Sequence, residues 1–149
     1  MLFSADFLHS QSEKTITIRV MDSKTGLPVT KDDLHFYLWA VKEDPGAFSY
    51  SPDTVLSGNQ TGTGTGGVAI PDGLNYIRTW VSFGPTSWGL VSCDIPKGKP
   101  HAIPIYSVSK ILNSGVVAPN LCSRKTATAK PGEFVLFVRQ MTFWEAMQI

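Results

Sequence analysis

The sequence has few charged residues and almost no excess of either sign. Thirteen lysines and arginines stand against twelve aspartates and glutamates, so the formal net charge of the 149-residue chain is +1. Proteins that hold nucleic acid concentrate positive charge on one surface, because their affinity comes largely from phosphate contacts. The densest basic group here, Arg124 and Lys125 with Lys130 nearby, is too small for that. We expect no nucleic-acid partner.

Long apolar runs are also missing. Nowhere do 18 apolar residues follow one another, so we expect no membrane-spanning segment. The first residues, Met1 to His9, have neither a basic start nor an uninterrupted apolar stretch, because Asp6 interrupts them. A secretion signal needs both features, and we expect none in the given chain.

Common catalytic motifs are absent as well. There is no Gly-x-Ser-x-Gly, and the glycines between residues 62 and 67 have neither the dinucleotide-binding spacing nor a following Gly-Lys-Ser/Thr. The histidines lie far apart in sequence, which does not favour a metal site. We expect no catalysis, no cofactor and no metal; the least favoured alternative is an enzyme whose metal site is gathered by folding from His35, His101, Tyr37 and Tyr106.

Cysteine is scarce. Cys93 and Cys122 are the only two, and 29 positions separate them. This spacing is unlike the short intervals of zinc sites and redox pairs. Two interpretations stay open: one disulfide in an exported protein, or two buried thiols in a cytosolic one.

Apolar residues are abundant, at 42% of the chain, and several stretches of them have strand-like patterns. Residues 15–21 alternate apolar and polar side chains, with Ile16, Ile18 and Val20 on one face. Residues 34–41, 76–83 and 133–141 are predicted as further strands. The last is apolar on both faces, so we expect it to lie deep in a sheet. The pattern predicts an all-β fold, an antiparallel β-sandwich of about seven or eight strands with one or two short helices.

We expect a single domain spanning residues 1–149. Residues 44–67 are poor in large aliphatic side chains and predict a mobile loop. Residues 107–132 form an insert before the last strand, with a short helix ending at Gly115, and we expect this insert to guard a sheet edge. Thr142 and Glu145 have the spacing of a capping box, which predicts one closing helical turn through Met147.

A family resemblance follows from the middle of the chain. The first strand is followed by Asp22-x-x-Thr25-Gly26-x-Pro28-Val29, a Gly-rich stretch, Gly67-Val-Ala69 and a strand Tyr76-Ile-Arg-Thr-Trp-Val81. This arrangement, from Thr15 to Phe83, resembles the carboxypeptidase regulatory-like domains, relatives of the prealbumin and collagen-adhesin B-type sandwiches. The resemblance implies a β-sandwich with a structural or adhesive role, usually extracellular, cell-surface or periplasmic, and it implies no catalysis.

Aromatic residues supply the candidate binding site. They fall on strand faces opposite the aliphatic sets, and flat rings on a rigid sheet can stack on sugars or hold a protein partner; they are Tyr37, Trp39, Trp80 and Trp88. The competing interpretation is that both sheet faces are buried. We expect a structural or protein-interaction module that binds a protein partner or itself, with a carbohydrate-binding module as the alternative.

Overall fold

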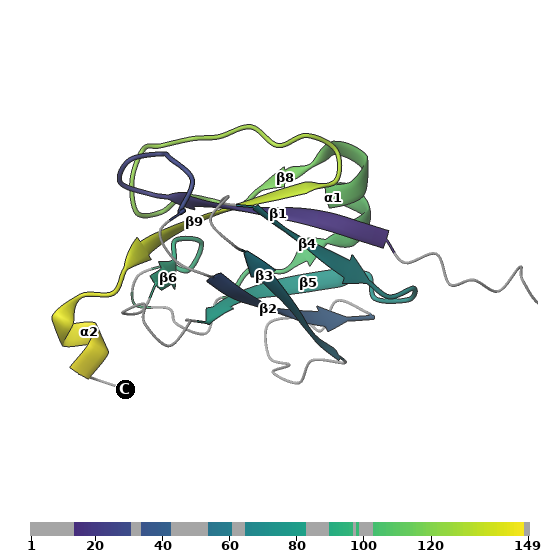
Figure 1. Ribbon diagram of the computed structural model, residues 1–149, viewed down its shortest axis with the longest axis horizontal. Helices are drawn as coiled ribbons and strands as arrows, with labels where there is room; N and C mark the ends of the chain where they lie inside the picture. Colours follow the sequence, from purple (N-terminus) through teal and green to yellow (C-terminus); the bar gives the residue numbers. More distant parts are fainter. Residues whose placement is uncertain are drawn as a thin grey trace, which may run out of the picture.

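A computed structural model describes residues 14–30, 34–42, 54–60, 65–82, 90–96, 98 and 103–147 of the chain. Within these residues the fold is all-β with two short helices (Figure 1). The strands are β1 (Lys14–Asp22), β2 (Leu34–Val41), β3 (Thr54–Gln60), β4 (Thr65–Ile70), β5 (Tyr76–Ser82), β6 (Leu90–Ser92), β7 (Tyr106–Ser107), β8 (Val116–Val117) and β9 (Glu133–Gln140). The helices are α1 (Val108–Ser114) and α2 (Phe143–Met147).

The strands form two sheets. One has the order β4-β1-β9-β6, with β8 also paired to β9, and the other has the order β3-β2-β5-β7. Most pairs are antiparallel, but β1 runs parallel to β9, with Ile18 opposite Phe134, and β8 also runs parallel to β9. The expectation of an antiparallel arrangement is therefore wrong for these pairs. Alternation of side chains specifies a strand but not the direction of its neighbour, and a parallel pair only needs a long connection, which the chain between β1 and β9 provides.

One hydrophobic cluster joins the two sheets. The inner face of β1 contributes Ile16, Ile18 and Val20, as the alternating pattern predicts, and all three are at most 1% exposed. The other sheet contributes Ala40 from β2 and Ile77 from β5, both fully buried. Strand β9 adds Phe134, Leu136 and Val138 in the middle of the first sheet. The prediction that the final strand lies deep in a sheet is confirmed, since Phe134 to Val138 are all buried.

The turn after β1 has the geometry that its sequence predicts. The carboxylate of Asp22 accepts hydrogen bonds from the backbone N–H groups of Lys24 and Thr25, at 2.7 and 3.0 Å. Gly26 follows with a φ of 71°, a conformation that favours glycine. The chain then returns alongside β1, where Pro28 forms a bridge to Met21.

Part of the expected mobile loop is regular structure. Strands β3 and β4 both lie within residues 44–67 or overlap them, and the remaining residues of that range are outside the described part of the chain. In β4 the core-facing positions are Gly66, Val68 and Ile70, which pair with β1 through a ladder that includes Ile18 opposite Gly66. The low strand propensity of glycine is overridden here because β1 supplies both the hydrogen bonds and the packing surface.

The insert before β9 is ordered and covers the first sheet. Helix α1 begins after Ser107, whose side chain accepts from the backbone N–H of Lys110, and it ends at Gly115 as expected. Strand β8 then occupies the edge of β9 beside Phe134 and Val135, in keeping with a guard on a sheet edge. The following residues cross the outer face of the sheet (Figure 1). A second hydrophobic cluster forms there, in which the insert residues Val117, Ala127 and Ala129 pack against Met21, Cys93, Val135 and Phe137.

Candidate functional site

The outer face of the first sheet is left open at one end, and a groove forms there. The insert covers Val135 and Phe137, but it does not cover the register partners Val91 and Arg139 further along β6 and β9. These two residues line a groove of about 990 Å³. Leu121 and Cys122 of the insert line it as well, with Ile95, Pro96 and Gly98 after β6 and with Thr142 and Glu145 of the C-terminal segment.

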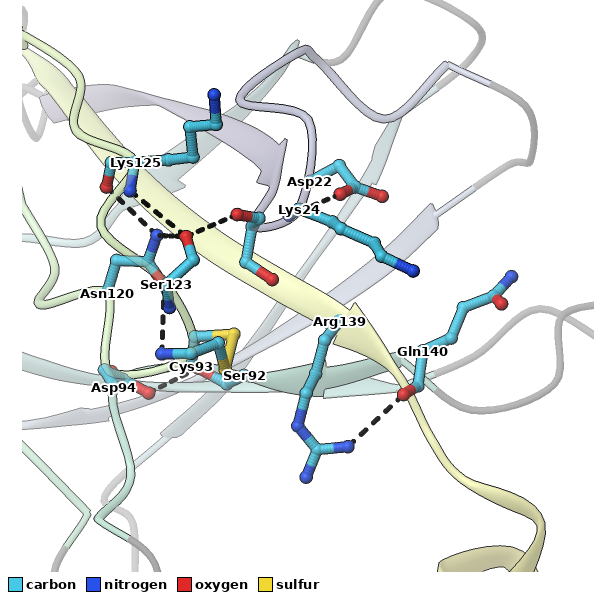
Figure 2. The surroundings of a disulfide bond; sticks show 12 residues. Asp22, Lys24, Ser92, Cys93, Asp94, Asn120, Ser123, Lys125, Arg139 and Gln140 are labelled. Atoms are coloured by element: carbon cyan, nitrogen blue, oxygen red, sulfur yellow. Dashed lines mark hydrogen bonds between the residues drawn. A yellow bond between two sulfur atoms is a disulfide. The ribbon is translucent and has the colours of Figure 1, made fainter.

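A disulfide fixes the insert against this end of the sheet. Cys93 and Cys122 are bonded, with their Cα atoms 5.5 Å apart (Figure 2). Cys93 is 1% exposed and belongs to the outer-face cluster, whereas Cys122 is exposed and lines the groove. The backbone N–H of Leu121 also donates to the carbonyl of Cys93 at 2.8 Å. The sequence left a bridge and two free thiols open, and in the structure the bridge defines one wall of the groove.

Asp94 forms the buried polar network behind the groove. It is 2% exposed, and its carboxyl accepts hydrogen bonds from the hydroxyl of Ser92 and, at 2.7 Å, from that of Tyr106. Burial, the charge of Asp94 and this hydrogen bond together raise the pKa of Tyr106 above its ordinary value. The network ties the segment after β6 to β7 and leaves the Ser92 hydroxyl bonded to a carboxyl group. The arrangement is suited to stabilising the fold at this position.

An ion pair crosses from the sheet to the C-terminal helix. The guanidinium of Arg139 donates to both carboxylate oxygens of Glu145, at 2.6 and 2.9 Å. It also donates to the carbonyl of Gln140 at 3.2 Å (Figure 2). The hydrogen bond from Arg139 is the main cause that lowers the pKa of Glu145 to about 2, and it raises the pKa of Arg139. Two parallel hydrogen bonds set the orientation of the helix as well as its distance from the sheet.

The capping box predicted at Thr142 and Glu145 is confirmed. The backbone N–H of Glu145 donates to the Thr142 hydroxyl at 3.2 Å, and the backbone N–H of Thr142 donates to Glu145 Oε1 at 3.2 Å. The hydroxyl of Thr142 in turn donates to the same carboxylate at 3.0 Å. A five-residue helix has little stability of its own, so these contacts and the Arg139 pair are what hold α2 in place.

Helix α2 carries an exposed apolar surface that the sequence interpretation did not identify. Phe143, Trp144 and Met147 are 69%, 73% and 63% exposed, and Leu121 across the groove is 55% exposed. The rings of Phe143 and Trp144 stand edge to face, with centroids 5.9 Å apart. We call these four residues the apolar rim. In the sequence, the apolar rim is indicated only by the aromatic pair Phe143 and Trp144 inside the capping box. The capping box predicts that these residues are helical, but it does not predict that they are exposed.

The aromatic residues predicted as a binding platform lie elsewhere. The register of β2 and β5 pairs Tyr37 with Trp80 and Trp39 with Arg78. Because ladder partners share a face and alternate residues return to it, positions 37, 39 and 80 belong to one face of the second sheet. Trp88 lies outside the described residues. The structure thus aligns three of the four positions, far along the chain from the apolar rim.

Part of that aromatic face is covered. Trp39 is half-buried, and the side chains of Tyr37 and Trp80 lie outside the described part of the structure. At the same face, Val41 and Arg78 are only 6% and 8% exposed. The end of the face near these two residues is therefore not open to a ligand.

The described residues contain no group of three His, Cys, Asp or Glu side chains placed to hold a metal ion. Of the residues considered for a metal site, Tyr106 is bonded to Asp94, while His101 and the side chains of His35 and Tyr37 lie outside what the structure describes. No helix in the described part of the chain is long and apolar enough to cross a membrane. Comparison with protein-family models, curated protein sequences and solved structures finds no match to the chain.

Proposed function

We propose that the chain is a non-catalytic β-sandwich module of the carboxypeptidase regulatory-like type, and that it binds a protein partner through α2 and the adjoining groove. The observation that carries the proposal is the exposure of Phe143, Trp144 and Met147 on a helix that is held in place by an ion pair and a capping box. The partner contacts this apolar rim and enters the groove beside it.

The combination of a fixed helix and exposed rings supports binding. Monomeric proteins rarely leave large apolar side chains clustered in water, and such clusters mark contact sites. Tryptophan is among the residues that most often dominate the energy of an interface. Because Arg139 and Thr142 already hold the helix in place, Trp144 loses little conformational freedom on binding. The entropic cost of binding is therefore smaller.

The chemistry of the groove also favours binding over catalysis. Among the described residues that line it, the two charged side chains, Arg139 and Glu145, neutralise each other at 2.6 Å. The serine among these lining residues, Ser92, donates to the buried carboxyl of Asp94. A nucleophile needs a neighbouring base that accepts its proton and a second group that stabilises the developing charge, and the described residues lining the groove are not arranged in this way.

Two features support the sandwich type named in the resemblance. The two sheets share one hydrophobic cluster, which is how layered β folds bury their inner faces. The Asp22 to Pro28 turn, which belongs to the resemblance, is closed by the hydrogen bonds of Asp22. A structural or adhesive module of that family is therefore the role we propose.

Site-specific photo-crosslinking in the cells that make the protein tests the proposal. A benzophenone side chain at position 143 is expected to form a covalent adduct with another polypeptide. The matched control is the same group at position 27, where Leu27 is also a large exposed apolar residue, 64% exposed, but lies in the turn after β1. Adducts at neither position, or equal yields at both, would contradict a binding role for α2.

The alternative is a carbohydrate-binding module that uses the face of β2 and β5. It is favoured by the register that aligns positions 37, 39 and 80. A glycan array with Trp39→Ala, Trp80→Ala and Trp144→Ala separates the two functions. Glycan binding that is lost with Trp39→Ala or Trp80→Ala and kept with Trp144→Ala would favour the carbohydrate module.

A further inference from the structure

The apolar rim adjoins the groove, because Leu121 belongs to both and Glu145 of α2 lines the groove. Glu145 lines the groove and faces Arg139, whereas Phe143, Trp144 and Met147 of the same helix are exposed. At 3.6 residues per turn, Phe143, Trp144 and Met147 fall within about 100° of the helix circumference, and Glu145 lies on the far side from Phe143. The helix therefore closes its own groove with one side and offers an apolar stripe with the other.

We infer that the protein partner is a second copy of this chain, and that two copies dock reciprocally about a two-fold axis, each placing the stripe of α2 in the other's groove. This inference rests on the proposed function and specifies its partner. A two-fold contact uses the same patch on both subunits, so a donor helix and an acceptor groove must be neighbours on one face. That condition is met here, because Leu121 belongs to both the apolar rim and the groove lining, and Glu145 of α2 lines the groove as well.

The area available matches a specific small interface. An aromatic side chain buries roughly 150–250 Å². At their exposed fractions, the four residues of the apolar rim leave roughly 500 Å² of apolar surface per copy, hence about 1,000 Å² for a pair before the groove walls are counted. The lower limit for specific protein interfaces is about 1,200 Å². The groove walls formed by Val91, Ile95 and Pro96 add further buried area toward this limit.

Size and charge are also compatible with this occupant. A groove of about 990 Å³ has room for more than one large side chain. The described residues of its walls are mainly apolar, and the ion pair between Arg139 and Glu145 is neutral overall, so a helix stripe without charge meets no unpaired charge among them. The formal charge of +1 for the whole chain means that two copies do not repel each other strongly.

Sedimentation equilibrium over a concentration series tests the inference. As the concentration increases, the weight-average mass is expected to rise from the monomer mass of 16.3 kDa to twice that mass and to rise no further. Trp144→Glu is expected to weaken the dimer at least tenfold, whereas Leu27→Glu, a matched change at another exposed apolar residue, leaves it unaltered. Circular dichroism and an intact Cys93–Cys122 bond establish that each variant is folded.

Mixing two variants tests the reciprocal geometry. Leu121→Arg blocks the groove rim, and Trp144→Glu removes the donor, so each variant alone is expected to dimerise poorly. A mixture of the two is expected to associate more tightly than either alone, because a mixed pair retains one unaltered helix facing one unaltered groove. Absence of this rescue, or growth of the wild type beyond the dimer, would overturn reciprocal docking.

The same measurements distinguish this inference from the proposed function. A wild type that stays monomeric at every concentration overturns the second copy as partner. If the crosslinker at position 143 then yields an adduct with a different polypeptide, the binding role of α2 stands without self-association. If it yields no adduct, both proposals fail.

Discussion

Apolar side chains are buried at the beginning of β9 and exposed just beyond its end. At its beginning, Phe134 is fully buried, with β1 on one side and β8 on the other, and its ring lies 4.8 Å from that of Tyr106. Beyond its end, Phe143 is 69% exposed on a helix held by polar contacts. The same residue type stabilises the fold at one end and is displayed at the other. Burial follows from how many elements the chain brings together, and only the first end is enclosed on all sides.

The largest expected effect comes from truncating each phenylalanine in turn. Phe134→Ala removes a buried ring and leaves a cavity in the shared core, so we expect the free energy of unfolding to fall by roughly 3–5 kcal/mol. Phe143→Ala is expected to change it by no more than about 0.5 kcal/mol, because the side chain is already in water. Urea denaturation at a concentration where the chain is monomeric measures both. Similar losses for the two variants would show that the comparison is wrong.

Breaking the disulfide is expected to have the next largest effect. It joins the buried Cys93 to the exposed Cys122, and so it connects the enclosed part of the sheet to the groove wall. Closing a loop of about 30 residues stabilises a fold by roughly 3.6 kcal/mol in the chain-entropy model. Urea midpoints with and without a thiol reductant measure the effect.

The control for the disulfide is the double variant Cys93→Ala/Cys122→Ser. It is expected to have the lower midpoint of the reduced protein and no response to the reductant. A wild-type midpoint that does not move on reduction, with loss of the bond verified by mass spectrometry, would contradict a stabilising role.

Replacing Gly115 by alanine is expected to lower the free energy of unfolding more than replacing Gly73. Gly115 ends α1 with φ 74° and ψ 155°, a region that is essentially restricted to glycine. A Cβ there would also collide with the carbonyl oxygen of Lys130 and lie 2.9 Å from the Cβ of Ala129. We expect Gly115→Ala to cost about 2–3 kcal/mol and to loosen the insert from the outer face of the sheet.

The matched variant for this prediction is Gly73→Ala. Gly73 also has a positive φ, 89°, but an added Cβ would meet nothing within 4 Å. Its cost is then limited to backbone strain, about 1 kcal/mol. Thermal unfolding of the two variants side by side gives the difference. An equal loss would mean that the contact with Lys130 adds nothing.

Local patterns in the sequence predict the local structure well. The alternation in β1, the turn at Gly26, the end of α1 at Gly115 and the capping box at Thr142 each depend on residues close together in the chain, and each is found in the structure. The direction of β9 beside β1 and the strand β3, inside the expected loop, depend on partners far away in sequence. A short-range pattern carries no information about such partners, which is why these features were missed.

The groove was not predictable for the same reason. Val91, Leu121 and Arg139 come from three separate segments that meet only when β6, the insert and β9 assemble. The exposure of Trp144 was equally hidden, since an aromatic residue in an apolar sequence is more often buried. The predicted aromatic face, in contrast, follows from strand alternation, and the register of β2 and β5 aligns three of its four positions.

The smallest expected effect concerns the charge that positions α2. Glu145 has its pKa lowered to about 2 by the hydrogen bond from Arg139, against an ordinary value of about 4.3 in an unfolded chain. The carboxylate therefore contributes stability that is fully present above about pH 4.5 and is lost as the pH falls through about 2. Because both side chains are about one third exposed, we expect a local loosening of α2 and no global unfolding from this group.

NMR titration of the Glu145 side-chain carboxyl measures this effect, with an expected midpoint near 2. In Arg139→Gln the midpoint is expected to rise but to stay below about 4.3, because the charge-assisted hydrogen bonds are gone while the Thr142 contacts, which also lower this pKa, remain. A wild-type midpoint already near 4.3 would mean that the ion pair does not persist in solution. Phe143 and Trp144 would then lie on a loosely held segment after β9, and the low ordering cost that favours α2 as a binding element would be lost.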